Sequence, residues 1–552
     1  MSPLDVWVYR DSKQLAHGGS LLRALERSIA QVARLRAPAG RRQAAIEALI
    51  VAGELEAALA DAADPLEHVV GEATDALAAV VIGQPADLSV CAEGIAHARA
   101  PRSVTIRPQE GFAYYALHPQ AYAAASRVVD AREVVVIGLR SIGTTLAAVT
   151  AAALRTRGVS AKRATVRPIG APGDRRVVFG PELEELLRRA READAGVVIV
   201  DEGPGLSGSS FLATGEAVVA AGVRRERVLF IMSRAVDPDR LRAPDAARRW
   251  RAFRTAVAPS SMFAPVRPGT SGGARDVSGG AWRLLHYSRD QDWPPVIEAM
   301  ERRKLLFGGR LFKFEGLGSS GLAARHRASA LAAEGIALDP SEEGDGWASY
   351  SWGGRPLMAG DLDAELIEHM ARYCARRPSL CPLVSAESDL DPVVTKNLAA
   401  ILGDVARVPS LDLVRVATTD GRFAPHEWLR MDDGSVRKTD AIAHGDDHLF
   451  PGPTDIAWDL AGAIVEWGME RDAREHFLSA YLRASGDDAS RRIEPWLIAY
   501  AAIRAALTHF AIDAASPAEV PRLKQDFERY RARLAASVAK WRHTELPKVA
   551  QS

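Results

Sequence analysis

The chain has 552 residues, a length that predicts about three domains of ordinary size. Its composition, 47% hydrophobic and 25% charged, is that of a globular protein and excludes general disorder. Seventy basic residues balance seventy acidic ones, so the whole chain has no net attraction for nucleic acid or for an anionic membrane. We therefore expect small-molecule substrates and no nucleic-acid partner.

The cysteines and the most apolar stretches bear on the compartment. Cys91, Cys374 and Cys381 are too few for a disulfide framework. The first residues contain neither the basic segment nor the apolar core of a signal peptide. Stretches such as ALAAVVIG are shorter than the roughly 18 residues that a membrane span needs. We expect a cytoplasmic protein that does not enter a membrane, and a homodimer is possible.

The predicted elements begin with helices over residues 20–85, where apolar residues recur every three or four positions. From about residue 88, short apolar runs alternate with helical patterns, as in REVVVIGLRSIGT followed by TLAAVTAAALRTRG. The same alternation recurs in AGVVIVDEG followed by FLATGEAVVAAGV. Strands that are apolar throughout and alternate with helices predict a doubly wound parallel sheet, and hence an α/β fold class.

The alternation ends in residues 235–280, which are rich in Pro, Gly and Ser and predict a domain junction near 260–280. Beyond it, half-buried strand patterns such as RLFKFEGLG flank a helix, and the remainder is mainly helical. This pattern predicts an α+β, two-lobed second half. The expected organisation is a helical N-terminal extension (1–87), an α/β domain (88–260), a linker (261–285) and a second domain (286–552).

Two loops that follow buried strands of the α/β domain carry the residue types of a binding site. Residues 138–145, GLRSIGTT, offer backbone amides, hydroxyl groups and the Arg140 guanidinium, which suit a phosphate or pyrophosphate. Residues 201–210, DEGPGLSGSS, place two carboxylates beside a Gly/Ser loop. Ligands of doubly wound sheets bind where such loops leave the strands, so we expect the two loops to form one site.

A dinucleotide site is the alternative interpretation of the second loop. Gly203, Gly205 and Gly208 match the spacing of the dinucleotide fingerprint. That fingerprint requires its first glycine directly after the strand and an acidic residue about twenty positions later. Asp201 and Glu202 intervene here, so the dinucleotide interpretation is the weaker one.

The segment VVIVDEGPGLSGSS resembles the phosphoribosyl pyrophosphate motif of type I phosphoribosyltransferases, and GLRSIGTT resembles their pyrophosphate loop. The resemblance covers roughly residues 88–235 and departs from the family in its longer phosphate loop. It implies that Asp201 and Glu202 hold the ribose hydroxyls near Mg²⁺ and act in catalysis. It also implies that phosphoribosyl pyrophosphate is bound by Arg140, Ser141, Ile142, Gly143, Thr144, Gly205, Ser207, Gly208, Ser209 and Ser210, with Arg167 and Arg175 on a flap. Tyr114, Tyr115, His118 and Tyr122 are either a hood over the acceptor or ordinary core residues.

The second half contains three aspartates at regular spacing. Asp420 begins a loop, Asp440 ends the short strand SVRKT, and Asp459 lies in WDLAG. Kinase-like phosphotransferases need one aspartate to orient the hydroxyl and another to hold Mg²⁺. His444 and His448 in HGDDH suggest a metal site instead, but the surrounding glycines and proline argue against the shared helix face that two such ligands require.

This spacing resembles the aminoglycoside and choline kinase-like family over roughly residues 290–545. The resemblance implies that Asp420 is catalytic, that Asp440 and Glu427 (or His426) hold Mg²⁺, and that Lys313 binds ATP. It also implies a hinge over residues 352–357, WGGRPL, with Glu334 as the candidate partner of Lys313. The chain departs from the family in lacking its HGD triplet, its metal-binding Asn and its Gly-rich nucleotide loop.

Together these patterns predict a bifunctional enzyme of small-molecule metabolism. One half transfers phosphoribosyl groups from phosphoribosyl pyrophosphate with Mg²⁺, and the other phosphorylates an acceptor with ATP. Two alternatives remain at this point. The protein either senses phosphoribosyl pyrophosphate with an inactive kinase-like half, or modifies a macromolecule as a toxin or defence component.

Overall fold

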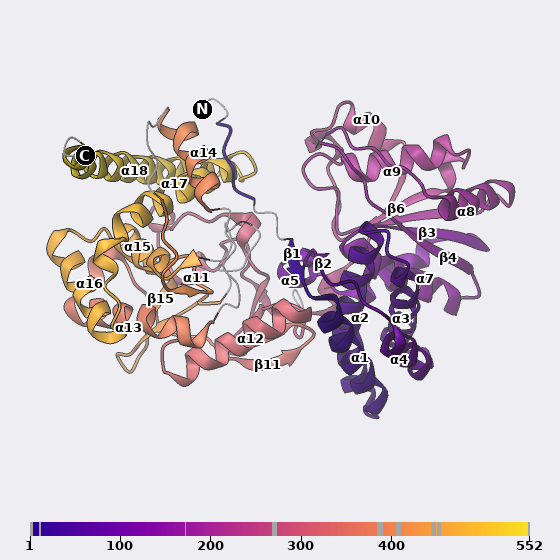
Figure 1. Cartoon of the computed structure of the whole chain (residues 1–552), viewed down its shortest axis with the longest axis horizontal. Helices are drawn as coiled ribbons and strands as arrows, with labels where there is room; N and C mark the ends of the chain where they lie inside the picture. The colour runs from indigo at the N-terminus through magenta and orange to yellow at the C-terminus, as the bar shows by residue number, and fades with distance from the viewer. Residues whose placement is uncertain are drawn as a thin grey trace.

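The computed structural model describes residues 4–9, 13–171, 173–267, 273–382, 390–403, 410–442, 449 and 454–549. It has a mixed α/β architecture with one parallel sheet and several antiparallel sheets. Figure 1 shows two bodies side by side, with the parallel sheet in one and most of the C-terminal helices in the other.

The helices predicted over residues 20–85 are confirmed. They are α1 (Gly18–Arg34), α2 (Pro38–Asp61) and α3 (Leu66–Val81), followed by α4 (Leu88–His97). A short strand before them, β1 (Gln14–Ala16), pairs antiparallel with β2 (Val104–Ile106). Helices α2 and α3 pack against the sheet helix α7 (Ile142–Thr156), and their apolar residues belong to the same core cluster. The N-terminal helices therefore cover one face of the sheet.

The predicted parallel sheet is present, and all its neighbouring strands run parallel in the order β4-β3-β5-β6-β7. Its strands are β3 (Glu133–Leu139), β4 (Ser160–Val166), β5 (Gly196–Val200), β6 (Val228–Met232) and β7 (Arg254–Val257). Strand β3 is buried on both faces because Val134 and Val136 join the core on the α7 side, whereas Val135 and Ile137 join the opposite core. That opposite core includes α8 (Pro181–Glu192), α9 (Ser209–Ala220) and α10 (Ala246–Arg251). Between β2 and β3 lie α5 (Glu110–Tyr114) and α6 (Pro119–Ala125).

The order of the strands brings the two predicted loops together. The chain passes from β3 to β4 on one side and then to β5 on the other, so the direction of winding reverses between β3 and β5. Gly143, after β3, packs so closely on the end of β5 that a Cβ atom there would lie 2.8 Å from the Val200 carbonyl oxygen. Such a reversal point is where doubly wound sheets bind ligands.

The second half begins with an antiparallel sheet in the order β11-β12-β10-β9-β8. Its strands are β8 (Arg275–Asp276), β9 (Lys304–Phe307), β10 (Arg310–Phe314), β11 (Ser341–Gly344) and β12 (Trp347–Ser351). Helix α11 (Arg283–His286) lies between β8 and β9, and α12 (Gly318–Ala333) lies between β10 and β11. Because β8 lies in this sheet, part of the segment expected as a linker belongs to the second half.

The remaining lobe is mainly helical, as predicted. Its helices are α13 (Ala364–Leu380), α14 (Leu390–Leu402), α15 (Ala457–Glu466), α16 (Arg471–Ser485), α17 (Ile493–Ile512) and α18 (Val520–Val549). Small antiparallel pairings join β13 (Arg355–Pro356) to β15 (Trp428–Arg430), β15 to β16 (Val436–Lys438), and β14 (Val416–Ala417) to β17 (Thr454–Asp455). Helix α17 has the length and hydropathy of a membrane span, contrary to the sequence expectation, but 83% of that stretch is buried inside the fold, as in the core helix of a soluble protein.

The two halves share one hydrophobic core cluster, which combines residues of α2 with Leu305, Phe312 and Trp347 of the antiparallel sheet. The Leu317 amide donates a hydrogen bond to the Phe112 carbonyl (2.8 Å), and the Gly318 amide donates one to Glu47 of α2 (2.6 Å). Burial raises the pKa of Glu47 to about 7. Separating the halves would expose this apolar surface, so experiments on the chain should use its full length.

Candidate functional site

The loop after β3 has the geometry of an anion-binding turn. Ser141 has φ = 102°, a conformation that L-residues rarely adopt, and it directly precedes helix α7. The helix therefore presents its first amides at the end of the strand. Thr145 donates a hydrogen bond to Gln109 (2.9 Å), whereas the fully buried Thr144 hydroxyl oxygen has no hydrogen-bond partner among the described residues.

The acidic pair after β5, Asp201 and Glu202, is half-buried. The Tyr122 hydroxyl donates a hydrogen bond to the Asp201 carbonyl oxygen (2.6 Å). Burial raises the pKa of the Asp201 carboxyl to about 7, although the field of Arg167 lowers it. The Glu202 carboxylate packs on Gly111, where a Cβ atom would lie 2.6 Å from Oε2. Both carboxylates thus lie where the two loops meet, with restricted access to water.

The Gly/Ser loop satisfies part of its own hydrogen-bonding capacity. Gly205 (φ = 59°) and Gly208 (φ = 72°) take left-handed conformations that allow the loop to turn into α9. The hydroxyls of Ser207 and Ser209 hydrogen-bond to each other (2.8 Å). The Gly173 amide, on the predicted flap, donates to Ser209 (3.3 Å), which brings the flap to this loop.

The arginines predicted to bind phosphate have protein partners in this structure. Arg140 and Arg167 both form ion pairs with Asp61, the last residue of α2. Arg175 donates to the Pro168 carbonyl (3.3 Å). Asp61 and Arg140, which lies in the loop after β3, are 79 residues apart in the sequence. Sequence analysis missed it because nothing distinguishes this aspartate from others at helix ends.

Three of the four aromatic residues proposed as an acceptor hood, Tyr114, His118 and Tyr122, are buried, whereas Tyr115 is 40% exposed. Tyr122 is fully buried beneath Asp201. The Arg302 guanidinium lies over the ring of Tyr114, 4.9 Å from its centroid. His118 stacks on Phe263, with ring centroids 4.1 Å apart. These contacts give Tyr114, His118 and Tyr122 structural roles that join segments of the fold.

The raised pKa of Asp201 predicts a pH-dependent cost to stability. The pKa in the folded protein (about 7) lies above the unfolded value, so the folded state binds the extra proton and loses stability as pH rises from about 4 to 7. Replacing Asp201 with Asn removes this loss. We expect Asp201→Asn to raise the unfolding temperature relative to wild type at pH 8, and to do so much less at pH 5, in thermal unfolding followed by circular dichroism.

Asp194→Asn is the matched control for this measurement. Arg227 and Arg224 hold the pKa of the exposed Asp194 carboxyl well below its usual range. Its contribution to stability is therefore fully present at pH 5 and at pH 8, and the variant should show the same small loss at both. An Asp201→Asn difference that does not grow with pH would contradict the burial of this carboxylate.

The second candidate site is a cavity between the antiparallel sheet and the helical lobe. Three residues predicted from the sequence, Lys313, Glu427 and Asp440, line it together. The predicted hinge contributes Trp352, Gly353 and Pro356 to the same wall. The wall also includes residues that sequence analysis did not select, namely Glu301, Lys304, Glu315, Arg422 and Lys438.

Two lysines converge on Asp440. The Lys313 ammonium forms an ion pair with Asp440 and lies 3.3 Å from Glu315, not near Glu334 as expected. Glu334 instead pairs with Arg376 (2.5 Å). Lys304, directly opposite Lys313 on the neighbouring strand, lies 3.0 Å from Glu301 and 3.7 Å from Asp440. Sequence analysis did not select Lys304 or Lys438, although both lie on strands, as Lys313 does, and lysine is rare in this chain.

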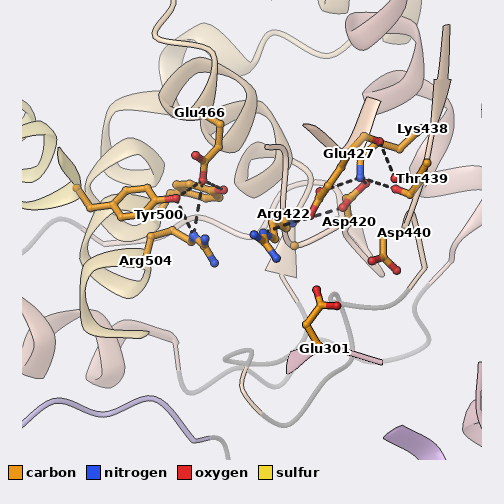
Figure 2. Close-up of polar contacts among 12 residues, drawn as sticks. Glu301, Asp420, Arg422, Glu427, Lys438, Thr439, Asp440, Glu466, Tyr500 and Arg504 are labelled. Carbon is orange, nitrogen blue, oxygen red and sulfur yellow. Dashed lines mark hydrogen bonds and ion pairs between the residues drawn. The ribbon is translucent and has the colours of Figure 1, made fainter. Parts of the chain in front are cut away.

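Glu427 is neutralised by neighbouring cations. Its carboxylate lies 3.1 Å from Lys438 and 3.2 Å from Arg422. Figure 2 shows the Lys438 ammonium close to both Glu427 and Asp420, with Asp440 and Glu301 below them in this view. His426, the alternative metal ligand, stacks on Trp282, with ring centroids 5.6 Å apart, and burial lowers its pKa well below the usual value. It is therefore a neutral part of the aromatic wall.

Asp420 lies beneath the cavity and does not line it. It is completely buried, accepts a hydrogen bond from the Tyr373 hydroxyl, and lies 3.3 Å from the Lys438 ammonium. Its backbone amide donates to Asp459 (2.9 Å), a residue whose pKa burial raises to about 7. Sequence analysis expected Asp420 to be catalytic, whereas in this structure its carboxylate is held by core residues and does not reach the cavity.

The burial of Asp420 predicts a structural effect of its removal. Asp420→Asn leaves the Lys438 ammonium and the Arg377 guanidinium with less compensating charge in a dry environment. We expect a loss of roughly 3–5 kcal/mol in the free energy of unfolding, measured by urea denaturation of the full chain. The exposed Asp432, in the turn between β15 and β16, provides the control variant Asp432→Asn, which should change stability by less than about 0.5 kcal/mol. Unchanged stability in Asp420→Asn would mean that the fold does not need this carboxylate, and Asp420 would again be a candidate catalytic residue.

The structure shows no preformed multi-ligand metal centre in its described part. No group of three or more His, Cys, Asp or Glu side chains lies where it could hold a metal ion within the described ranges. The HGDDH segment, residues 444–448, lies outside those ranges, so its metal hypothesis stays untested. Asp440 fits Mg²⁺ as a single carboxylate, since Mg²⁺ is usually bound by one or two carboxylates together with substrate phosphates.

Comparisons with known proteins find no matching family and only distant similarity to solved structures. No protein-family model matches the chain, and no curated protein matches it. The solved structures similar to it include a choline/ethanolamine kinase family protein from Mesorhizobium loti (14% identity, 42% of this chain, 89% of that chain, TM-score 0.28). They also include a choline kinase from Streptococcus pneumoniae (13%, 42%, 89%, 0.29) and a Plasmodium vivax ethanolamine kinase (12%, 47%, 85%, 0.29). Similarity at these TM-scores does not identify the function of the chain.

Proposed function

We propose that the chain is a two-site enzyme that binds phosphoribosyl pyrophosphate in its first half and ATP in its second, using Mg²⁺ in both. The observation that carries the second assignment is the ion pair between Lys313 and Asp440, which brings together residues 127 positions apart at one cavity. The observation that supports the first is the meeting of the β3 and β5 loops at the reversal point of the sheet.

The layout of the second half supports nucleotide binding. In kinases, the lysine that contacts the nucleotide phosphates lies on the third strand of a small sheet, and an aspartate beyond the catalytic loop holds Mg²⁺. Lys313 lies on β10, the third strand of its sheet, and Asp440 follows the β15–β16 hairpin. The segment between β8 and β9, where kinases have the Gly-rich loop, here spans residues 277–303 and lines the cavity with Trp282, His286 and Glu301.

The residues available for phosphoryl transfer are fewer than the sequence suggested. Lys313 would bind the phosphates of ATP, and Asp440 would hold Mg²⁺, which neutralises charge on the phosphates. Glu427 is paired with Lys438 and Arg422, and Asp440 is paired with Lys313 and Lys304, so Mg²⁺ would have to displace a cation at either carboxylate. Asp420 is buried and paired with Lys438, so it would have to become accessible before it could orient an acceptor hydroxyl.

These pairings favour a second candidate function, a protein that senses phosphoribosyl pyrophosphate and has a nucleotide-binding but inactive kinase-like half. In that case the cavity binds ATP, and no phosphoryl group is transferred. The first half is common to both candidates: Asp201 and Glu202 would hold the ribose hydroxyls, and the Gly205–Ser210 amides the 5′-phosphate.

Calorimetric titration of the full chain tests the proposal. Each ligand, ATP and phosphoribosyl pyrophosphate, is titrated with and without Mg²⁺, and hydrolysis and pyrophosphate release are followed in parallel. Mg²⁺-dependent binding of both ligands with turnover supports the two-site enzyme, and binding without turnover supports the sensor. Failure to bind ATP at millimolar concentration removes the nucleotide assignment, and failure to bind phosphoribosyl pyrophosphate removes the other.

A further inference from the structure

Asp61 stands at the centre of three arginines that come from separate segments. Its carboxylate oxygens lie 3.0 Å from Arg107, 3.3 Å from Arg140 and 2.6 Å from Arg167. Arg107 follows β2, Arg140 follows β3, and Arg167 follows β4. Three guanidiniums therefore lie within ion-pair distance of a single carboxylate, that of Asp61. These four groups together carry an excess of positive charge at the ends of the strands.

The position of Asp61 makes its role as the shared ion-pair partner of three arginines unusual. It is the last residue of α2, and the C-terminal end of a helix carries partial negative charge that disfavours a carboxylate. The arginines offset this cost: Arg140 also donates to the Ala60 carbonyl (3.2 Å) at the same helix end. A ligand with two or more negative charges and several oxygens would match three guanidiniums better than one carboxylate does.

The cluster is accessible and lies beside the first candidate site. Asp61 is 20% exposed, and the three arginine side chains are 22–32% exposed, so solvent and ions can reach them. Arg140 belongs to the loop after β3, and Arg167 donates to the Arg140 carbonyl (2.8 Å). Arg167 also lies near enough to Asp201 to lower the pKa of that carboxyl.

We propose that Arg107, Arg140 and Arg167 form a site for a phosphate or pyrophosphate group, and that Asp61 is its internal occupant, which an incoming anion displaces. The site deepens the proposed function of the first half and rests on it. Asp61 holds the three guanidiniums in place while the site is empty and competes with the ligand for them. Removing its charge frees all three for the anion.

Titration with inorganic pyrophosphate tests the site directly. Asp61→Asn keeps the size of the side chain and removes its charge, so pyrophosphate should bind the full-length variant roughly tenfold more tightly than the wild type. Adding Arg107→Met to Asp61→Asn should reverse most of that gain. Glu72→Gln, which removes an exposed carboxylate from α3, is the control and should leave the affinity unchanged. Binding to Asp61→Asn that is equal to or weaker than wild type overturns the proposal.

Parallel titrations with phosphoribosyl pyrophosphate separate this inference from the proposed function. If Asp61→Asn gains affinity for pyrophosphate while no variant binds phosphoribosyl pyrophosphate, the anion site stands and the proposed function fails. If the wild type binds phosphoribosyl pyrophosphate but Asp61→Asn gains no affinity for either ligand, the function stands and the role of Asp61 as a displaceable occupant fails.

Discussion

Asp440→Asn should abolish the Mg²⁺ dependence of ATP binding. Asp440 has φ = 55°, a conformation that asparagine tolerates well, so this substitution removes the charge with little backbone strain. Without the carboxylate, Mg²⁺ loses its protein ligand, and the affinity for the Mg²⁺–ATP complex should fall on the order of 100-fold. Affinity for ATP in the absence of metal should stay the same or rise, because a negative charge beside the phosphates is gone. Calorimetry on the full chain with Mg²⁺ or with a chelator measures both.

Lys313→Met provides the complementary result. It removes a cation from the same ion pair and should weaken ATP binding with and without Mg²⁺. Asp432→Asn, in the exposed turn of the neighbouring hairpin, should behave as the wild type. Equal losses in Asp440→Asn and Lys313→Met under both conditions would mean that the pair only holds the cavity together, and the metal assignment of Asp440 would fail.

The double variant Asp201→Asn, Glu202→Gln should lose binding of phosphoribosyl pyrophosphate by on the order of 100-fold or more, and with it any release of pyrophosphate. The two carboxylates are the acidic groups at the junction of the β3 and β5 loops that we assign to the ribose hydroxyls. The double variant should still fold, because burying the charged Asp201 carboxylate is less favourable than burying the neutral side-chain amide of asparagine. Calorimetric titration in the presence of Mg²⁺, with the unfolding temperature recorded in parallel, measures both effects.

A double variant of exposed acids in the same domain, Glu226→Gln with Asp239→Asn, is the control and should retain wild-type affinity. Retained binding in the Asp201, Glu202 variant would remove the ribose assignment. Loss of phosphoribosyl pyrophosphate binding with retained binding of inorganic pyrophosphate would instead support a division of the ligand between the acidic pair and the arginine cluster.

Local sequence patterns predicted the elements that carry the first site. Runs such as EVVVIGL have no polar face, so they can only be strands that are covered on both sides. The loops that follow them must then lie at one edge of a parallel sheet. The sequence could not predict that helix α2 covers this edge or that Asp61 reaches Arg140 and Arg167, since such contacts depend on how distant helices pack.

The second site shows the same division between local pattern and packing. The spacing of the aspartates and the resemblance to kinase-like proteins pointed to Asp440 and Lys313, and the structure brings the two side chains into contact. The same spacing suggested Asp420, which the structure buries beneath Lys438 and Tyr373. Spacing along the chain gives the order of residues in a hairpin, but it does not distinguish a carboxylate that faces a cavity from one that faces the core.

The sequence by itself determined the N-terminal helices, the parallel sheet, the two glycine-containing loops and the candidate residues within them, because hydrophobic periodicity and turn composition act over short distances. Only the tertiary structure decided which charges meet. It paired Asp61 with three arginines, Glu427 with Lys438 and Arg422, and Asp440 with two lysines. Charge pairing depends on distances between segments that lie far apart in the chain, and those distances exist only after the helices have packed on the sheets.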